Sequence, residues 1–437
     1  MKQLMIILTV LCLAGLHAGQ AQNNAQQILQ DFGDLKSEMS MIWKEVQKQL
    51  SSDEAAIEFV QLNLAEKNQI DTILFAALVL RPGMEAPVWI PLFELKQLES
   101  ILQATMFHTQ IRIEKLYVEK GKQLYQLVWQ ALEKELSNVK TVYYSTTGLL
   151  STIALNALPT DNENMLLSDR YNLHLLSSIG KIARLKNETA HFFLKDTIVI
   201  YGGLTYNSPQ SKMIETEKRN FAEWRYLAGT KTEAEQIISL MENNRIPCKY
   251  YTQDQGNEES FKQLSGTNAE VIHLATHCFF LPDIENNAFA EIIQRLGGDK
   301  ENLLLRSGLI MSGANDLWLN REEIHKEDGI LTGDEISRLN LAKTKLAILS
   351  ANESGLGYIK GYEGIFGFQR AFKLAGVESL IMSLWAVPDS QTTELMVLFY
   401  KEWLSGQSRL NAFKAAQQKV REKYESPYYW AAFVMLD

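Results

Sequence analysis

Two segments of the sequence end in residues whose positions suit nucleophilic catalysis. Residues 271–276 form an apolar, strand-like run that is followed by His277 and Cys278. Residues 345–350 form a similar run, and Asn352 follows it after one residue. In doubly wound α/β folds, functional side chains gather just beyond the carboxyl ends of the strands. We therefore expect the two runs to be neighbouring strands that bring His277 and Asn352 together, as a base and a nucleophile must be.

The residue types decide what chemistry such a pair can do. The imidazole of His277 can act as a base, but the carboxamide of Asn352 is neutral and essentially inert as a nucleophile. The thiol of Cys278 is the alternative nucleophile. Because consecutive side chains of an extended segment point in opposite directions, His277 is badly placed to activate it. Burial as a small apolar residue is the favoured role for Cys278.

The second half of the chain alternates between strand-like and helix-like segments. This alternation predicts a mostly parallel sheet that is flanked by helices. Thr230 and Glu233 have the spacing of a helix-capping pair, which predicts a helix that begins at Thr230. The predicted strands are residues 196–201, 248–252, 271–276, 345–350, 379–384 and 430–436. The predicted helices are residues 230–243, 258–264, 363–374, 390–404 and 409–424.

The first half of the chain has a less regular α/β pattern. Strands are predicted at residues 55–60, 72–80, 87–91 and 140–144, with a helix at residues 123–136. We expect residues 22–190 to form a smaller α/β subdomain, with the larger domain at residues 191–437. Residues 279–341 are the least regular stretch, and we interpret them as an excursion over the end of the sheet, with room for a short helix or hairpin.

Charge and composition exclude several classes of function. The net charge is −9 and no run of lysine and arginine is present, which argues against a nucleic-acid partner. No group of cysteine and histidine residues has the spacing of a zinc site, so we expect neither a metal nor another cofactor. Cys248 and Cys278 are the only cysteines beyond the first 21 residues, and spacing alone does not pair them.

The first 21 residues read as a secretory signal. Lys2 gives a positive start, an apolar run without charge follows, and Gly19 and Ala21 are small residues at the positions that a signal peptidase inspects. The run is shorter than the ~20 apolar residues that span a bilayer. We expect cleavage after Ala21, a secreted or periplasmic protein, and no stable membrane anchor after cleavage.

The segments around His277 and Asn352 resemble the signatures of the CHAT family, which is related to caspases and separases among the cysteine peptidases of caspase-like fold. The resemblance runs from about Trp43 to the C-terminus, with several linked motifs in one order. It implies a caspase-like, mostly parallel sheet flanked by helices, preceded by the smaller subdomain. The segments that carry it are residues 124–129, 148–150, 157–159, 227–235, 271–282, 346–370, 381–385 and 427–433.

By resemblance, the family cleaves peptides with a histidine and a cysteine. His277 matches the catalytic histidine, and Asn352 occupies the position of the nucleophilic cysteine. Cys278 occupies a position that is usually glycine, whose amide helps to bind the oxyanion. Ser350 and Ser354 match positions that are serine or threonine in active relatives, so neither is a substitute nucleophile.

These observations predict a pseudopeptidase, an inactive relative that binds a protein or peptide partner. Loss of the nucleophile in a protease removes on the order of 10⁶ in turnover. The alternative is an active cysteine-type endopeptidase that uses His277 with a non-standard nucleophile such as Cys278.

Overall fold

The structure is a computed structural model, and the chain divides into two compact units. The first unit lies within residues 1–150 and 155–189, and the second within residues 151–154 and 190–437. The predicted signal at residues 1–21 and the residue Asn352 both lie outside the described residues. The described residues are 43–66, 69–103, 109–162, 165–187, 197–207, 223–280, 302–319, 327–350 and 362–437.

The first unit is a mixed sheet with short helices. Its strands follow the spatial order β3-β2-β1-β4-β5, in which β1, β2 and β3 are antiparallel and β4 and β5 run parallel to β1. These strands are β1 (Glu54–Glu66), β2 (Gln69–Leu80), β3 (Val88–Glu94), β4 (Thr141–Ser145) and β5 (Asn172–Leu175). The helices are α3 (Leu95–Gln103), α4 (Thr109–Glu114), α5 (Gly121–Val128), α6 (Leu167–Arg170) and α7 (Ile182–Asn187), with shorter helical turns η1 (Lys115–Glu119), η2 (Gln130–Leu132), η4 (Leu155–Ala157) and η5 (Ile179–Lys181).

The second unit contains the sheet that positions the candidate site. The order is β14-β13-β12-β8-β6-β7, and every neighbouring pair is parallel except β13 with β14. These strands are β6 (Thr197–Leu204), β7 (Cys248–Gln253), β8 (Ala269–Leu274), β12 (Leu346–Leu349), β13 (Ser379–Ser383) and β14 (Phe433–Leu436). β8 and β12 are entirely buried, as strands covered on both faces must be.

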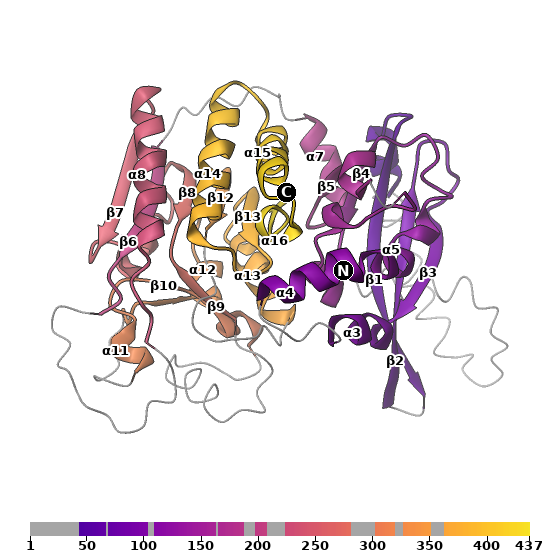
Figure 1. Ribbon diagram of the computed structural model, residues 1–437, viewed down its shortest axis with the longest axis horizontal. Helices are drawn as coiled ribbons and strands as arrows, with labels where there is room; N and C mark the ends of the chain where they lie inside the picture. The colour runs from indigo at the N-terminus through magenta and orange to yellow at the C-terminus, as the bar shows by residue number, and fades with distance from the viewer. Residues whose placement is uncertain are drawn as a thin grey trace, which may run out of the picture. The chain divides into compact units, whose positions relative to one another are not determined.

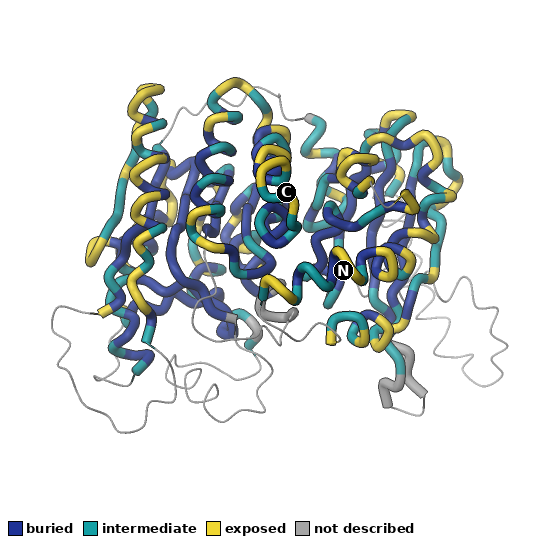
Figure 2. Tube along the Cα trace, viewed as in Figure 1, coloured by how far each residue is buried: buried dark blue, intermediate teal, exposed yellow. Residues whose placement is uncertain are grey.

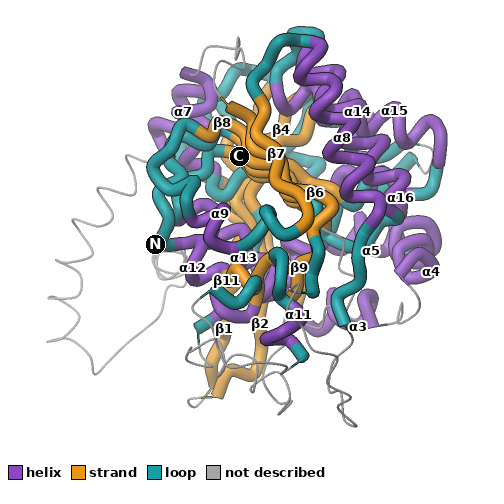
Figure 3. The backbone as a smooth tube through the Cα atoms, turned by 90° about the vertical axis from the view of Figure 1, so that its left-hand side faces the viewer, coloured by secondary structure: helices purple, strands orange, loops and turns teal. Residues whose placement is uncertain are grey.

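Helices cover both faces of these six strands (Figure 1). The long helices α8, α14 and α15 lie side by side on one face, and α9, α12 and α13 lie on the other (Figure 3). The helices of this unit are α8 (Ala228–Asn243), α9 (Glu258–Lys262), α11 (Asn315–Trp318), α12 (Gly333–Ser337), α13 (Tyr362–Leu374), α14 (Asp389–Leu404), α15 (Arg409–Tyr424) and α16 (Pro427–Trp430), with one 3₁₀ turn η6 (Leu303–Arg306). The expected α/β architecture, a mostly parallel sheet between helices, is confirmed.

A second, three-stranded sheet lies beyond the carboxyl end of β8. It consists of β9 (His277–Phe280), β10 (Ser307–Ile310) and β11 (Ile330–Thr332) in the antiparallel order β11-β10-β9. Gly308 allows these strands to pack, because a Cβ there would lie 2.6 Å from the Phe279 ring and 2.7 Å from the Leu331 carbonyl oxygen. The stretch that we expected to be irregular therefore contains two strands of a small sheet.

The strands are buried in the core, and the outer faces of the long helices are exposed (Figure 2). Apolar side chains from β6, β8, β12 and β13 are almost fully buried, which is the main stabilising contribution in a sheet of this kind. Among the described residues, no helix is both long and apolar enough to cross a membrane.

Three sequence-based expectations about element ends were wrong. Helix α8 begins at Ala228, two residues before the predicted start, and Thr230 is not its cap. The Thr230 hydroxyl instead donates to the Leu227 carbonyl oxygen at 2.7 Å and accepts from the Gly203 amide at 3.0 Å. Trp430 lies in α16, so the last strand starts only at Phe433. The predicted helix at residues 123–136 ends at Val128 and continues as a 3₁₀ turn.

Candidate functional site

The register of the sheet places the carboxyl ends of β8 and β12 next to each other. Leu274 of β8 pairs with Leu349 of β12, and the two strands are parallel. His277 is the third residue after Leu274, and Asn352 is the third residue after Leu349. The expectation that the two runs are neighbouring strands is therefore confirmed. The position of the Asn352 side chain is not, because residues 351–361 are outside the described part of the chain.

His277 is buried at the start of β9, with 1% of its surface exposed. Its Nε2 lies 2.7 Å from the carbonyl oxygen of Arg225. Because a carbonyl can only accept, Nε2 must carry the hydrogen. In the neutral ring the lone pair then belongs to Nδ1, which is the nitrogen able to take a proton from another group.

Two aromatic rings contact the His277 imidazole. The ring centroid of Tyr206 lies 4.9 Å away and that of Trp224 lies 5.0 Å away. Trp224 in turn contacts Trp318, with 5.0 Å between ring centroids. Tyr206 and both tryptophans belong to one buried cluster under the small sheet. Such packing limits rotation of the imidazole and so fixes the direction of both nitrogens.

A chain of hydroxyl groups anchors the strand next to His277. Thr276 donates to the Ile310 carbonyl oxygen at 2.6 Å. A threonine hydroxyl has only one hydrogen, so the Tyr206 hydroxyl, 2.9 Å from the same oxygen, is the donor to Thr276. Burial raises the pKa of Tyr206, although the bond with Thr276 and the backbone of His277 lower it. Tyr206 is therefore a neutral donor near neutral pH.

Cys278 follows His277 in β9 and is buried opposite Leu309 of β10. Because successive side chains in a strand point to opposite faces, the Cys278 thiol and the His277 ring diverge. Cys248 is the other reduced cysteine among the described residues. It lies at the amino end of β7, whereas His277 lies beyond the carboxyl end of the parallel strand β8. Burial, with a smaller contribution from Glu242, raises the pKa of Cys248 to about 11.

Ser350, which the sequence analysis set aside as a nucleophile, and His273 are further polar residues of these two strand segments. Ser350 is buried directly after β12, whereas Ser354 lies outside the described residues. His273 is fully buried in β8, where its Nε2 lies 2.8 Å from Glu233 Oε1 and its Nδ1 lies 3.3 Å from the Tyr400 hydroxyl. Side chains from α8 and α14 thus contact both ring nitrogens, which indicates a structural role for His273.

Sequence reasoning missed the Arg225 carbonyl and the residues that hold it. A backbone oxygen has no residue-type signal, so no pattern could have revealed it as the partner of His277. Asn315 was also missed, although it lies in the stretch with the least regular sequence. Its side-chain amide contacts the backbone of Trp224 on both sides, at 2.9 and 3.0 Å.

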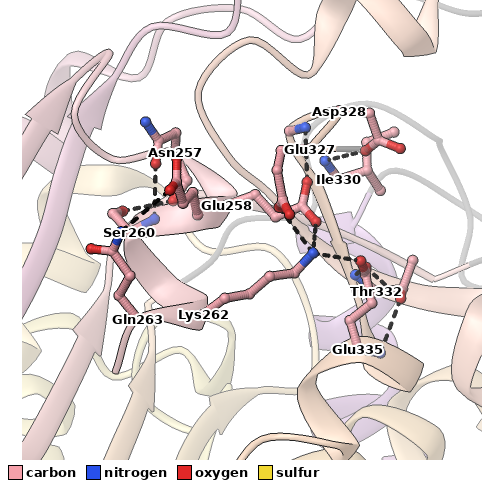
Figure 4. A network of polar contacts seen from close by, with 12 residues as sticks. Asn257, Glu258, Ser260, Lys262, Gln263, Glu327, Asp328, Ile330, Thr332 and Glu335 are labelled. Atoms are coloured by element: carbon pink, nitrogen blue, oxygen red, sulfur yellow. Dashed lines mark hydrogen bonds and ion pairs between the residues drawn. The ribbon is translucent and has the colours of Figure 1, made fainter. Parts of the chain in front are cut away.

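Behind the small sheet, Lys262 connects three carboxylates (Figure 4). Its ammonium group bonds to Glu258, to Glu327 at 2.9 Å and to Glu335 at 2.9 Å. These residues come from α9, from the segment before β11 and from α12. Glu258, 1% exposed, also accepts from the Gly329 amide at 3.1 Å. We call these four side chains and Asp328 the Lys262 cluster. Its contacts link α9 and α12 to the segment before β11.

Burial dominates the electrostatics of the Lys262 cluster. It raises the pKa of Glu258 to about 9, with help from repulsion by Glu335. It also raises the pKa of Asp328 to about 7. For Glu335 burial acts in the same direction, but the bonds with Lys262 and Thr332 outweigh it and lower the pKa. Within the described ranges, no group of three acidic, histidine or cysteine side chains is arranged to hold a metal ion.

Comparison with solved structures shows distant similarity to peptidases. The separase–securin complex of Saccharomyces cerevisiae aligns with 91% of this chain and 30% of its own, at 10% identity and a TM-score of 0.48. The Arg-specific cysteine proteinase gingipain R aligns with 78% of this chain and 74% of its own, at 8% identity and a TM-score of 0.39.

Comparison of sequences gives two relatives and one family. Tetratricopeptide repeat protein 28 of Mus musculus is 23% identical over 226 residues, which are 48% of this chain and 9% of that protein. The same protein of Homo sapiens is 27% identical over 179 residues, or 39% and 7%. The chain thus spans less than a tenth of the length of these relatives. The model of the CHAT domain matches residues 118–437, and the chain therefore belongs to the CHAT domain family.

Proposed function

We propose that this peptidase-like CHAT protein is a pseudopeptidase, which binds a protein or peptide segment next to His277 and does not cleave it. The observation that carries the proposal is a contrast at two neighbouring strand ends. The His277 imidazole is buried and oriented by its hydrogen bond to the Arg225 carbonyl oxygen, and the resemblance to the CHAT family assigns Asn352 to the position of the nucleophile. A carboxamide cannot serve as the nucleophile of a peptidase, so a site with asparagine at that position can bind a peptide but is not expected to cleave it.

Three features of the site support binding without cleavage. The carboxamide of Asn352 can donate and accept hydrogen bonds, so it is suited to hold a peptide group. The Cys278 thiol diverges from the His277 ring and is buried. The Cys248 thiol starts a strand whose opposite end faces the site, and its pKa is raised to about 11. Neither cysteine has the environment of an activated nucleophile.

The test restores the missing thiol. The unaltered chain and its Asn352→Ala variant should give the same background with a mixed peptide library. Asn352→Cys should cleave a subset of the peptides, and adding His277→Ala to that variant should remove the cleavage. We expect a gain of at least about 10³-fold, a cautious fraction of what a nucleophile contributes in a protease. Strong cleavage by the unaltered chain that disappears in His277→Ala would overturn the proposal.

The same library tests the binding part of the proposal. A peptide that the Asn352→Cys variant cuts should bind to the unaltered chain and be recovered intact from the complex. Fluorescence anisotropy with the labelled peptide gives the affinity, and mass spectrometry gives the integrity of the peptide. If the cut peptides show no saturable binding to the unaltered chain, the protein is an inactive peptidase relative that does not bind peptides, and the binding part of the proposal is wrong.

We also propose that the protein is exported and acts outside the cytoplasm, in the periplasm or in the surroundings of the cell. The proposal is supported by the charge, the apolar run and the small residues within residues 1–21. The partner is then a protein or peptide of that compartment and not a nucleic acid, in agreement with the net charge of −9.

A further inference from the structure

The acceptor of the His277 hydrogen bond lies in a segment without helix or strand. Arg225 is part of residues 223–227, which precede α8 and have no ladder of backbone hydrogen bonds of their own. A carbonyl in such a segment can rotate unless other groups hold the peptide units around it. The direction of the Arg225 carbonyl therefore requires a cause outside the segment.

Asn315 holds this segment by hydrogen bonds to the backbone of Trp224, the residue before Arg225. Its Oδ1 accepts from the Trp224 amide at 2.9 Å, and its Nδ2 donates to the Trp224 carbonyl oxygen at 3.0 Å. The two bonds imitate one rung of a β-ladder, and they fix the peptide units on both sides of Trp224. One of these units leads directly to Arg225.

The orientation of the Asn315 amide is itself determined. The second hydrogen of Nδ2 goes to Asn207 Oδ1 at 3.1 Å, and the backbone amide of Asn315 donates to the Tyr206 carbonyl oxygen at 2.9 Å. A flipped amide would set its nitrogen against the Trp224 amide and its oxygen against two acceptors. Asn315 is fully buried, with 0% of its surface exposed, so such mismatches would be costly.

Strand β10 helps to position both the His277 ring and the Arg225 carbonyl that accepts its hydrogen bond. β10 pairs with β9, and the register sets Ile310 opposite His277. After β10 the chain makes a turn in which Gly313 donates to the Thr205 carbonyl oxygen at 3.2 Å, and it reaches Asn315, the first residue of α11, five residues after Ile310. The imidazole is thus positioned from β10 through strand pairing, and the carbonyl is positioned from β10 through Asn315.

We propose that Asn315 is a positioning residue for His277. It holds the Trp224 backbone so that the Arg225 carbonyl faces Nε2, and the ring is kept in the form with hydrogen on Nε2. In that form Nδ1 is the acceptor nitrogen of the ring. The proposal does not depend on whether the protein cleaves or binds peptides, because it concerns the ring in the chain alone.

The experiment records which nitrogen carries the hydrogen. The chain is prepared with ¹⁵N-labelled histidine, and the signals of His277 are assigned among the seven histidines by their loss in His277→Gln. Spectra are recorded without peptide, at a pH at which the ring is neutral. The unaltered chain should show the Nε2–H form. Asn315→Asp keeps the shape and loses both donated bonds, and the ratio of Nε2–H to Nδ1–H should fall about fivefold, the factor that corresponds to one hydrogen bond of ~1 kcal/mol.

Two further variants keep the test decisive. Asn257→Asp makes the same chemical change at the cap of α9, where the acceptor for the Ser260 amide is retained, and should leave the ratio unchanged. Asn207→Ala removes the partner of the second Nδ2 hydrogen at an exposed position and should lower the ratio in the same direction, by a smaller factor. It replaces Asn315→Asp if that variant does not fold. An unchanged ratio in a folded Asn315→Asp variant, or in Asn207→Ala if Asn315→Asp does not fold, overturns the proposal.

Discussion

At the scale of single residues, two buried histidines of the second unit have different partners. His273 contacts a carboxylate and a tyrosine hydroxyl, so both nitrogens serve as ties between β8 and the helices on one face. Nε2 of His277 contacts a backbone carbonyl oxygen instead. The first arrangement uses the imidazole as a structural link, whereas the second fixes Nε2 as the nitrogen that carries the hydrogen. The pattern of a histidine near a strand end does not distinguish these cases, and only the partners do.

The cysteines give a prediction at the same scale. Raising the pKa of Cys248 from 9.0 to about 11 lowers its thiolate fraction near neutral pH on the order of 10²-fold, and Cys278 is protected by burial. Alkylation by iodoacetamide in the folded chain should therefore be slow at both residues, and fast after unfolding, when followed by mass spectrometry.

A second measurement links this prediction to His277. Alkylation of Cys278 should have the same rate in the His277→Ala variant as in the unaltered chain. Rapid labelling that depends on His277 would instead support an active peptidase with Cys278 as nucleophile. Cys278→Ala in the Asn352→Cys background should retain cleavage, because the buried thiol takes no part in it.

At the scale of elements, the tie between α8, β8 and α14 should contribute measurably to stability. Glu233→Ala leaves the buried His273 without its carboxylate and should lower the free energy of unfolding by about 2–3 kcal/mol. Glu233→Gln keeps a hydrogen-bond acceptor and should cost less. Glu235→Ala is the control on the same helix, because Glu235 is exposed and its pair with Lys231 is loose at 3.7 Å. It should change stability by less than ~0.5 kcal/mol. Urea unfolding measures all three, and equal effects at both positions would contradict the assigned role.

The Lys262 cluster gives a prediction about pH. The folded chain holds a proton on Asp328 up to a pKa of about 7, whereas an unfolded aspartate loses it near ~3.9. Between these values the folded state binds more protons than the unfolded state, so this residue makes stability fall as pH rises. Burial also raises the pKa of Glu258, so Glu258 acts in the same direction. The contribution of these two residues to the free energy of unfolding should therefore be most favourable in mild acid.

Asp328→Asn isolates this effect. Its amide oxygen can still accept from the Ile330 amide, as Oδ1 now does at 2.8 Å. The variant should match the unaltered chain near pH 4 and exceed its free energy of unfolding by about 1–2 kcal/mol above pH 7. Asp254→Asn, at an exposed turn, should stay within ~0.5 kcal/mol at both values. An Asp328→Asn variant that is less stable than the unaltered chain at pH 8 would show that the carboxylate is stabilising when ionised.

The success of sequence reasoning also differs by element. The strands β7, β8, β12 and β13 and the helices α14 and α15 lie within two residues of their predicted bounds, because buried apolar runs and helical periodicity are local signals. The cap of α8 could not be predicted in this way. Glu233 has the spacing of a capping residue, but the buried His273, four residues before His277, competes for its carboxylate, and that contact is set by the sheet.

At the scale of the whole molecule, the family region and the compact units do not coincide. The match to the CHAT domain begins at residue 118, within the first unit, and so includes β4 and β5 as well as the entire second unit. A division at residue 190 would separate strands that belong to the same family region. Experiments on His277 should therefore use a chain that retains residues 118–190.

The proposed export is testable on the whole chain by its first residue. When the gene is expressed in a bacterium with an intact secretion pathway, the exported protein should begin at Gln22, as read by mass spectrometry of the N-terminal peptide. Ala21→Arg places a large charged residue where the signal peptidase requires a small one, and this variant should keep its first residues. Uncleaved Met1 in the cytoplasm of cells that carry the unaltered gene would contradict export.

In an oxidising compartment both cysteines should still titrate as thiols after unfolding without reductant. Cys248 lies at the amino end of β7 and Cys278 lies beyond the carboxyl end of β8, whereas a disulfide requires Cα atoms within ~7 Å of each other.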